Sequence, residues 1–267
     1  SHDPSTILEI GCGTGLLLLP LASECHRYHG TDLSASVLES VHARIARRPE
    51  LQEIVALSQG EADDIGDLQL DPVDTVIINS VFQYFPGVDY LVRVLEGALA
   101  QVVDGGRIIV GDVRSLPLLD AFHASVEVHH APGTMTREEL WQRVQHRVQQ
   151  EEELALDPAF FRDWAAGTGV VSRVEILPKR DHHLNEMSMF RYQVVLHIGS
   201  APQKGTNHPS PSVPEIDWCG ERLTFAELRA QLTDDRPDRL RLRNVTNSRV
   251  EEAVRALQWS KGGTGLE

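Results

Sequence analysis

Short β-rich runs alternate with longer amphipathic stretches as far as residue 199, and this alternation limits the folds open to the chain more than any other feature. It predicts an α/β fold with a parallel, doubly wound sheet and helices on both faces. The last two runs have no helical stretch between them, so we expect an antiparallel last strand. The seven predicted strands are Thr6–Ile10, Tyr28–Thr31, Ile54–Leu57, Thr75–Asn79, Arg107–Gly111, Arg173–Leu177 and Tyr192–His197. The predicted helices are Val37–Arg47, Val88–Val102, Leu118–His129, Arg137–Glu153 and Pro158–Ala166.

A proline-rich stretch after the last strand predicts a domain boundary. Residues 200–214 carry four prolines and almost no large apolar side chain, a composition typical of a linker. We therefore predict a principal domain at 1–199, a linker at 200–214 and a small α/β C-terminal appendage at 215–267. Because an apolar strand starts at Thr6 with no methionine before it, we expect the chain to be a piece of a longer protein.

Composition excludes several kinds of partner. With 39 acidic and 25 basic residues the formal charge is −14, which is contrary to the basic surface that nucleic-acid binding requires. No apolar run is long enough to span a membrane. The three cysteines form no CxxC pair and the histidines form no HxxxH pattern, so we predict neither disulfides nor a metal site. These features are typical of a cytoplasmic protein.

The first strand runs directly into a glycine loop, Gly11-Cys12-Gly13-Thr14-Gly15. Glycines at such a turn let the backbone bend sharply and let a ligand approach it. Asp32 follows the next strand, at the distance where an acid binds the ribose hydroxyls of a nucleoside. The loop and this acid together predict a nucleoside cofactor.

The spacing of the loop narrows the choice of cofactor. Leu16 stands where the dinucleotide fingerprint has its third glycine, and no Gly-Lys-Ser/Thr follows, which excludes a phosphate-binding loop of the Walker type. The GxGxG spacing, with Glu9 two residues ahead of it, resembles the S-adenosylmethionine loop of class I methyltransferases. That resemblance implies a Rossmann-like fold and S-adenosyl-L-methionine as cofactor, with S-adenosyl-L-homocysteine as product. It also implies a cofactor-binding set, which comprises Glu9, Gly11, Gly13, Gly15, Asp32, Glu61, Ala62, Asp63 and Asn79. Within this set, Glu61 or Asp63 would accept the adenine amine.

Longer motifs resemble the N-methyltransferase domains of non-ribosomal peptide synthetases. They span most of the chain in order and comprise Ile78–Pro86, Gly111–Ser115, Asp157–Phe161, Ile176–Arg180, Asn185–Glu186 and Phe190–Tyr192. The tail from Ile216 to Val250 is similar to the segment that precedes the resumed adenylation domain in such enzymes. The resemblance also implies an upstream lid over the cofactor, and we expect this region to lie outside the given sequence.

The resemblance implies methylation of the α-amino nitrogen of an aminoacyl thioester. This substrate is held on a carrier protein by a phosphopantetheine arm, and an adenylation domain is the neighbouring partner. Two alternatives stay open. The acceptor is an oxygen or carbon atom of a carrier-bound group, or the chain is a truncated cofactor-binding structural module without activity.

Candidate catalytic residues lie at the carboxyl ends of the strands and on the late motif. Asp112, Tyr84, Asn185 and Glu186 are the candidates for accepting the amine proton or orienting the substrate. A salt bridge from Asp112 to Arg114 that holds the loop is an equal alternative, and Tyr84 could serve in packing instead.

The remaining charged clusters receive simpler assignments. One basic grouping, which comprises Arg114, Lys179, Arg180 and Arg191, is a candidate for binding the phosphate of the carrier arm, with Arg114 and Arg180 as its principal members. The run Glu151–Glu153 is predicted to end a helix as a solvated face.

Overall fold

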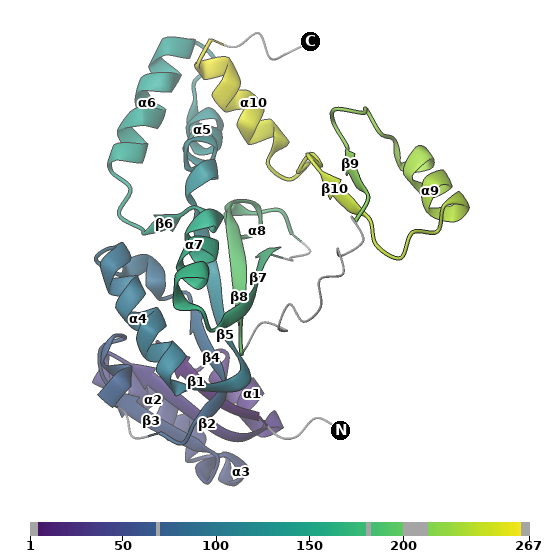
Figure 1. Ribbon diagram of the computed structural model, residues 1–267. Coiled ribbons are helices and arrows are strands. Elements are labelled where there is room, and N and C mark those ends of the chain that lie inside the picture. The colour runs from purple at the N-terminus through teal and green to yellow at the C-terminus, as the bar shows by residue number, and fades with distance from the viewer. Residues whose placement is uncertain (1–4, 68–69, 180–182, 200–212, 263–267) are drawn as a thin grey trace.

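The computed structural model describes residues 5–67, 70–179, 183–199 and 213–262, and its centre is one large sheet (Figure 1). Along the sheet the strand order is β3-β2-β1-β4-β5-β8-β7. The first five strands pair in parallel, whereas β8 is antiparallel to both β5 and β7. The strands of this sheet are β1 (Ser5–Ile10), β2 (Cys25–Asp32), β3 (Val55–Gln59), β4 (Val73–Asn79), β5 (Val102–Ser115), β6 (Ala155–Leu156), β7 (Val171–Pro178) and β8 (Arg191–Ile198).

This topology confirms the predicted doubly wound, mostly parallel sheet with an antiparallel last strand. The seven predicted strands are all present, and the structure adds β6, which pairs with the far end of β5 at Arg114 and Ser115. A strand of two residues has no periodicity to detect, so the sequence could not reveal it. Strand β5 is also longer at both ends than the predicted Arg107–Gly111, because it pairs with β4 as early as Val102 and continues along β8 as far as Arg114.

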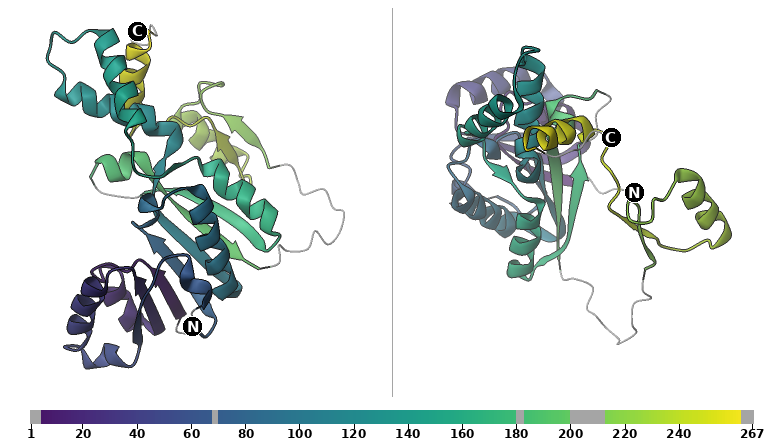
Figure 2. Two further views of the ribbon diagram at one scale, coloured as in Figure 1. Left: turned by 90° about the vertical axis from the view of Figure 1, so that its left-hand side faces the viewer. Right: turned by 90° about the horizontal axis from the view of Figure 1, so that it is seen from above.

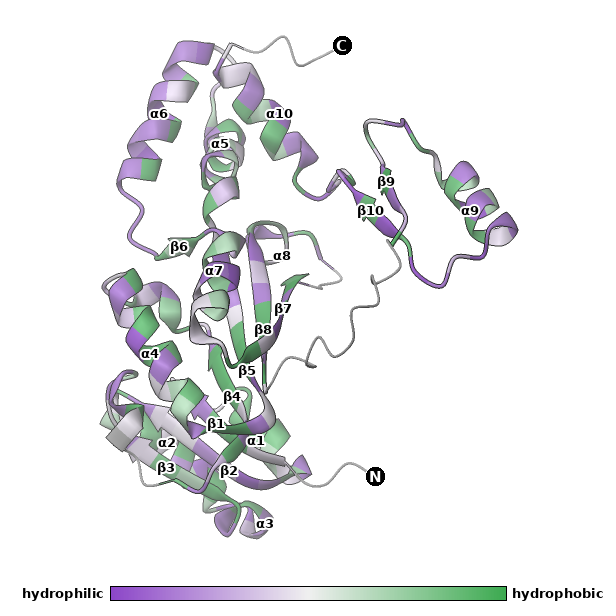
Figure 3. Cartoon of the chain, in the orientation of Figure 1, coloured by the Kyte–Doolittle hydropathy of each residue, from purple (hydrophilic) through white to green (hydrophobic). Residues whose placement is uncertain are grey.

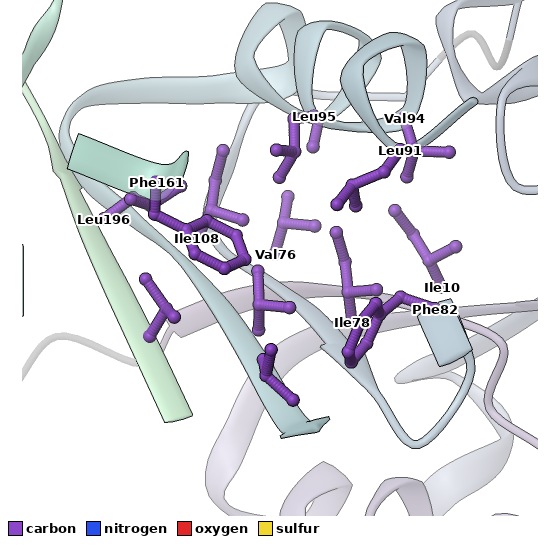
Figure 4. Close-up of a cluster of buried hydrophobic side chains, with 14 of the residues drawn as sticks. Ile10, Val76, Ile78, Phe82, Leu91, Val94, Leu95, Ile108, Phe161 and Leu196 are labelled. Atoms are coloured by element: carbon purple, nitrogen blue, oxygen red, sulfur yellow. The ribbon is translucent and has the colours of Figure 1, made fainter. Parts of the chain in front are cut away.

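Helices cover both faces of the sheet. Helices α4 and α7 lie on one face, over a core that includes Ile10, Ile78 and Phe82 (Figure 4). Helices α1, α2 and α3 lie on the other face, over a second core around Tyr28 and Ile77. The helices are α1 (Leu18–Leu21), α2 (Ala35–Ile45), α3 (Pro49–Gln52), α4 (Val88–Gln101), α5 (Leu119–His130), α6 (Arg137–Gln149), α7 (Pro158–Thr168), α8 (Glu186–Phe190), α9 (Phe225–Asp234) and α10 (Glu251–Ser260).

Strand β4 shows why the sheet is fixed in place. Its side chains alternate between the two cores, with Val76 and Ile78 on the α4 face and Ile77 on the α2 face. All three are at most 7% exposed, so the strand is apolar on both sides, as parallel strands under two helical layers require. Figure 3 shows this strand largely green, in contrast to the purple of helix α6.

Two helix boundaries differ from their predictions for local reasons. Helix α2 begins at Ala35 because the Ser34 side chain accepts a hydrogen bond from the Val37 N–H and caps it. Helix α6 begins at Arg137, as predicted, and a capping box of Thr136 and Glu139 stabilises this start. It ends at Gln149 and not at the predicted Glu153. The run Glu151–Glu153 therefore lies beyond the helix rather than on it.

Three helices form a cap above the carboxyl ends of β4 and β5. Helices α5 and α6 follow β5 in the chain, and α10 returns from the far end to pack against both of them (Figures 1 and 2). Strands β9 (Glu215–Asp217) and β10 (Arg241–Arg243) pair in parallel beside α9 and form a small separate unit. The predicted boundaries 1–199, 200–214 and 215–267 stay a prediction, but the packing of α10 joins the end of the described chain to the large unit.

Candidate active site

The glycine loop after β1 has a backbone conformation that residues with a side chain rarely adopt. Gly11, Gly13 and Gly15 have φ values of +73°, +51° and +75°, in the left-handed region that glycine adopts without strain. At Gly11 a Cβ would also lie 2.7 Å from Cγ2 of Val81. Two independent constraints, backbone angle and space, therefore require glycine at this position.

Asp32, at the end of β2, fixes the loop through its carboxylate. The backbone N–H of Gly13 donates to Oδ2 and that of Ser34 donates to Oδ1, each at 2.9 Å. The carboxylate thus stands at the edge of the loop, and each oxygen keeps further capacity to accept hydrogen bonds.

Glu9 is buried beneath the loop. It is 3% exposed, and Oε2 accepts a hydrogen bond from the Tyr28 hydroxyl at 2.8 Å. Burial raises the pKa of Glu9 to about 7, against the opposing effect of the Tyr28 hydrogen bond. Glu9 therefore supports the loop from within the fold.

A cavity of about 280 Å³ opens next to the loop. Of the predicted cofactor residues, Gly11, Asp32, Glu61 and Ala62 line it, and so does Tyr84, which we predicted as catalytic. Sequence reasoning missed a largely apolar part of the wall, formed by Leu33, Val81, Phe85, Pro86 and Tyr90.

The other predicted cofactor residues lie outside the wall of this cavity. Gly13 and Gly15 belong to the loop but do not line the cavity, and Asn79 is the last residue of β4. Asp63 accepts hydrogen bonds from Nε and Nη2 of Arg93 at 3.1 and 3.0 Å. Desolvation raises the pKa of Asp63, but hydrogen bonds from Tyr90 and Arg93 outweigh it and bring the pKa below its usual range. Asp63 thus anchors Arg93 and the wall residue Tyr90 from outside the cavity.

A polar cluster at the carboxyl ends of β4 and β5 centres on Asp112, which is 5% exposed. Ser80 donates to its Oδ2 and Lys179 Nζ donates to its Oδ1. Both Ser80 and Asp112 have positive φ, 56° and 59°. Such strain in non-glycine residues concentrates at functional sites.

An irregularity in β5 places Asp112. Val110 pairs with Val194 and Val113 with Tyr192, so β5 holds one extra residue between these pairs. An extra residue of this kind is a bulge, which redirects a side chain locally. Ser80 is followed directly by Val81, so the cluster adjoins the wall of the cavity.

A second cluster contains two buried arginines. The Nη2 atom of Arg114 donates to Oε1 of Glu186 at 2.8 Å, and its Nε to Oε2 of Glu153 at 2.9 Å. The Nη2 atom of Arg191 donates to the same two oxygens, at 3.3 and 2.9 Å. Arg191 Nη1 also donates to the backbone oxygen of Asp112 at 3.3 Å, so the two clusters adjoin.

This arrangement corrects three interpretations of the sequence. Asp112 pairs with Lys179, not with Arg114, because the bulge redirects its side chain. Glu153 is not on a solvated helical face, since it lies beyond α6 and pairs with both buried arginines. Arg191 was a candidate for the carrier-arm phosphate, but it pairs with Glu153 and Glu186 instead. Ser80 was not singled out, although a hydroxyl at a strand end was open to detection.

The remaining candidates are placed as follows. Asn185 caps α8, its side chain accepting from the Ser188 N–H at 3.0 Å, and Glu186 begins that helix with a side chain 43% exposed. Arg114 is 4% exposed, and its Nε and Nη2 pair with Glu153 and Glu186, whereas its buried Nη1 has no hydrogen-bond partner. Arg180 lies outside the described residues. In the described parts of the chain, no group of His, Cys, Asp and Glu is arranged to hold a metal ion, and no helix reaches the length and apolarity of a membrane span.

The fold and the sequence were compared with known proteins. Residues 8–108 match a family described as a methyltransferase domain. The N-methyltransferase NodS of Bradyrhizobium japonicum, solved with S-adenosyl-L-homocysteine, has a similar fold, with a TM-score of 0.50 at 14% identity over 74% of this chain and 79% of that one. Chondramide synthase cmdD of Chondromyces crocatus is 42% identical over 97% of this chain and 7% of its own length. The beauvericin nonribosomal cyclodepsipeptide synthetase of Beauveria bassiana is 39% identical over 81% of this chain and 7% of its own length.

The glycine loop, the cavity beside it and the sheet order define a methyltransferase domain of the doubly wound α/β class. The chain spans less than a tenth of the length of these curated relatives. It belongs to the family of methyltransferase domains carried within nonribosomal peptide synthetases, as the motifs predicted.

The cofactor of this family is S-adenosyl-L-methionine, and the cavity fits its nucleoside part. Asp32 and Glu61 offer carboxylates to hydroxyl or amine donors, and Gly11 brings the backbone of the loop into the cavity wall close against Val81. Phe85 and Tyr90 supply an apolar wall suited to the face of a purine.

Proposed function

We propose that this domain methylates the α-amino nitrogen of an aminoacyl thioester held on a carrier protein by a phosphopantetheine arm. The observation that carries the proposal is the buried Asp112 carboxylate, which adjoins the cofactor cavity through the Ser80–Val81 corner. An amine is a protonated cation at neutral pH, and a carboxylate at this place can accept its proton. The curated relatives are peptide synthetases, which supports an amino acid as acceptor.

The residues divide the work by their exposure. The bound cofactor supplies an electrophilic methyl group, so the protein has to orient the acceptor and deprotonate it. Glu186 has a half-exposed side chain and receives both arginines on Oε1, which leaves Oε2 for the incoming ammonium group. Asp112, deeper and held by Lys179 and Ser80, then takes the proton.

The same proposal assigns supporting roles to the other candidates. Asn185 fixes the start of α8 and with it the position of Glu186. Tyr84 lines the cavity and orients the reacting groups. Arg180 binds the phosphate of the carrier arm, and Arg114 assists if its acidic partners exchange for that phosphate. The neighbouring partner is an adenylation domain, and the three free cysteines suit the reducing cytoplasm.

Intact-mass analysis of an aminoacyl-loaded carrier protein tests the proposal directly. The expected result, with cofactor added, is a mass gain of one methylene unit that fragmentation places on the α-nitrogen. A gain placed on an oxygen or carbon atom would overturn the choice of acceptor. Cofactor binding without any gain would indicate a structural module. Replacing Arg180 by Ala should slow the carrier-bound reaction, and unchanged turnover would remove Arg180 from the site.

A further inference from the structure

The end of the described chain contacts the two polar clusters around Asp112 and Glu186, which together are called the acceptor half of the site. Arg249, which lies just before α10, donates from Nη1 to the backbone oxygen of Lys179 at 2.7 Å. Lys179 in turn donates from Nζ to Asp112. A guanidinium 70 residues away in sequence thus fixes the backbone whose side chain holds the proposed proton acceptor.

The apolar face of α10 also supports the second cluster of the acceptor half, the pair of Glu186 and Arg114. Val250 and Ala253 are 5% and 3% exposed and pack in one cluster with Phe190, while Phe122 is packed against that cluster. Phe190 ends α8, the helix that Glu186 begins. The centroids of the Phe122 and Phe190 rings lie 5.3 Å apart. The Arg114 guanidinium lies 4.6 Å from the centroid of the Phe122 ring. Both Glu186 and its arginine partner therefore rest on side chains that α10 covers.

Helix α10 is also fixed at its far end. Lys261 donates to Asp120 on α5 at 3.0 Å, and its Nζ lies 4.8 Å from the Trp141 ring centroid on α6. Contacts at both ends, with an apolar face between them, hold α10 against the cap in one position (Figure 2).

We propose that Arg249 is a positioning residue for methyl transfer, and that Arg249, Val250 and Ala253 complete the acceptor half of the site. This inference rests on the proposed function for its catalytic consequence. The small unit of β9, α9 and β10 lies between the large unit and this segment in the chain. Arg249 is thus a contact through which the chain, after the small unit, returns to the acceptor half of the site.

The test compares Arg249→Ala and Arg249→Lys with Arg255→Ala as a matched control. Arg255 is an arginine of α10, and its ion pair is with Glu251 of that helix. Arg249→Ala is expected to lower kcat for the loaded carrier roughly tenfold, since a misplaced catalytic group costs rate before affinity. The cofactor Kd should change less than about twofold. Arg249→Lys keeps a donor and should restore part of kcat, and Arg255→Ala should match the wild type.

A second measurement does not depend on turnover. The rate at which an amine-reactive acetylating reagent labels Lys179, followed by mass spectrometry, should rise in Arg249→Ala and stay at the wild-type value in Arg255→Ala. Wild-type kcat together with unchanged labelling would overturn the proposal, and so would a parallel loss of cofactor affinity. If the wild type does not methylate the carrier-bound amine, the proposed function fails, while the labelling result still decides whether Arg249 positions Lys179.

Discussion

The cofactor half and the acceptor half of this site are built in opposite ways. The cofactor half is built on the backbone of the loop after β1, which Asp32 holds through the N–H groups of Gly13 and Ser34, and side chains that follow β2, β3 and β4 line the cavity beside it. The acceptor half uses side chains from distant segments, so that Asp112, Glu153 and Arg249 meet through Lys179 and Arg191. The first half is fixed by local geometry and the second by tertiary packing.

This difference implies different responses to mutation. A loop made of backbone is sensitive to any added Cβ, whereas a side-chain network is sensitive to the loss of single charges and their partners. Variants in each half should therefore separate cofactor affinity from acceptor turnover.

The largest expected effect is in the cofactor half. Gly11→Ala adds a Cβ 2.7 Å from Val81 at a φ of +73°, which combines backbone strain with overpacking and should cost about 4 kcal/mol of stability. Thermal unfolding and calorimetric titration with S-adenosyl-L-homocysteine measure the loss. Gly13→Ala is the control for strain alone, since nothing lies within 4 Å of its Cβ. Equal losses in both variants would contradict the role of the Val81 contact.

Asp112→Asn should give the next largest effect, in the acceptor half. The amide keeps the shape of the carboxylate but accepts a proton far less readily, so kcat should fall roughly 100- to 1000-fold. Cofactor affinity should stay within about threefold of wild type, because the glycine loop is fixed by Asp32 instead. A kcat within a few-fold of wild type would assign proton transfer to Glu186 alone.

The same contrast explains how much of the molecule the sequence could predict. The seven strands of the sheet and the loop followed from periodicity and from Gly11, Gly13 and Gly15, because these features are encoded within short stretches. The pairing of Asp112 with Lys179 depends on a bulge in β5, which no local pattern announces. Glu153 is an example of a residue whose neighbours in sequence suggested solvent, although its neighbours in space are two buried arginines.

A pH effect of intermediate size should arise from Glu9 in the cofactor half. Burial raises its pKa from 4.5 to about 7, so the folded chain keeps a proton that the unfolded chain releases between these values. The resulting stability is complete below pH 4.5 and is lost as the pH rises through 7, by about 3 kcal/mol in all. Glu9→Gln keeps the neutral form and should remove this slope. Denaturant unfolding at a series of pH values measures it, and parallel curves for the two proteins would refute the assignment.

The smallest expected effect decides to which half Tyr84 belongs. Its side chain lines the cofactor cavity and is 76% exposed, so its ring should contribute to cofactor binding by contact. Tyr84→Ala should weaken cofactor binding about tenfold, or 1.4 kcal/mol, and Tyr84→Phe should change it less than about twofold. Calorimetric titration gives the affinity, and steady-state kinetics with loaded carrier gives kcat. If Tyr84→Phe instead lowered kcat with the affinity unchanged, the hydroxyl would act on the acceptor, and the boundary between the two halves would run through this residue.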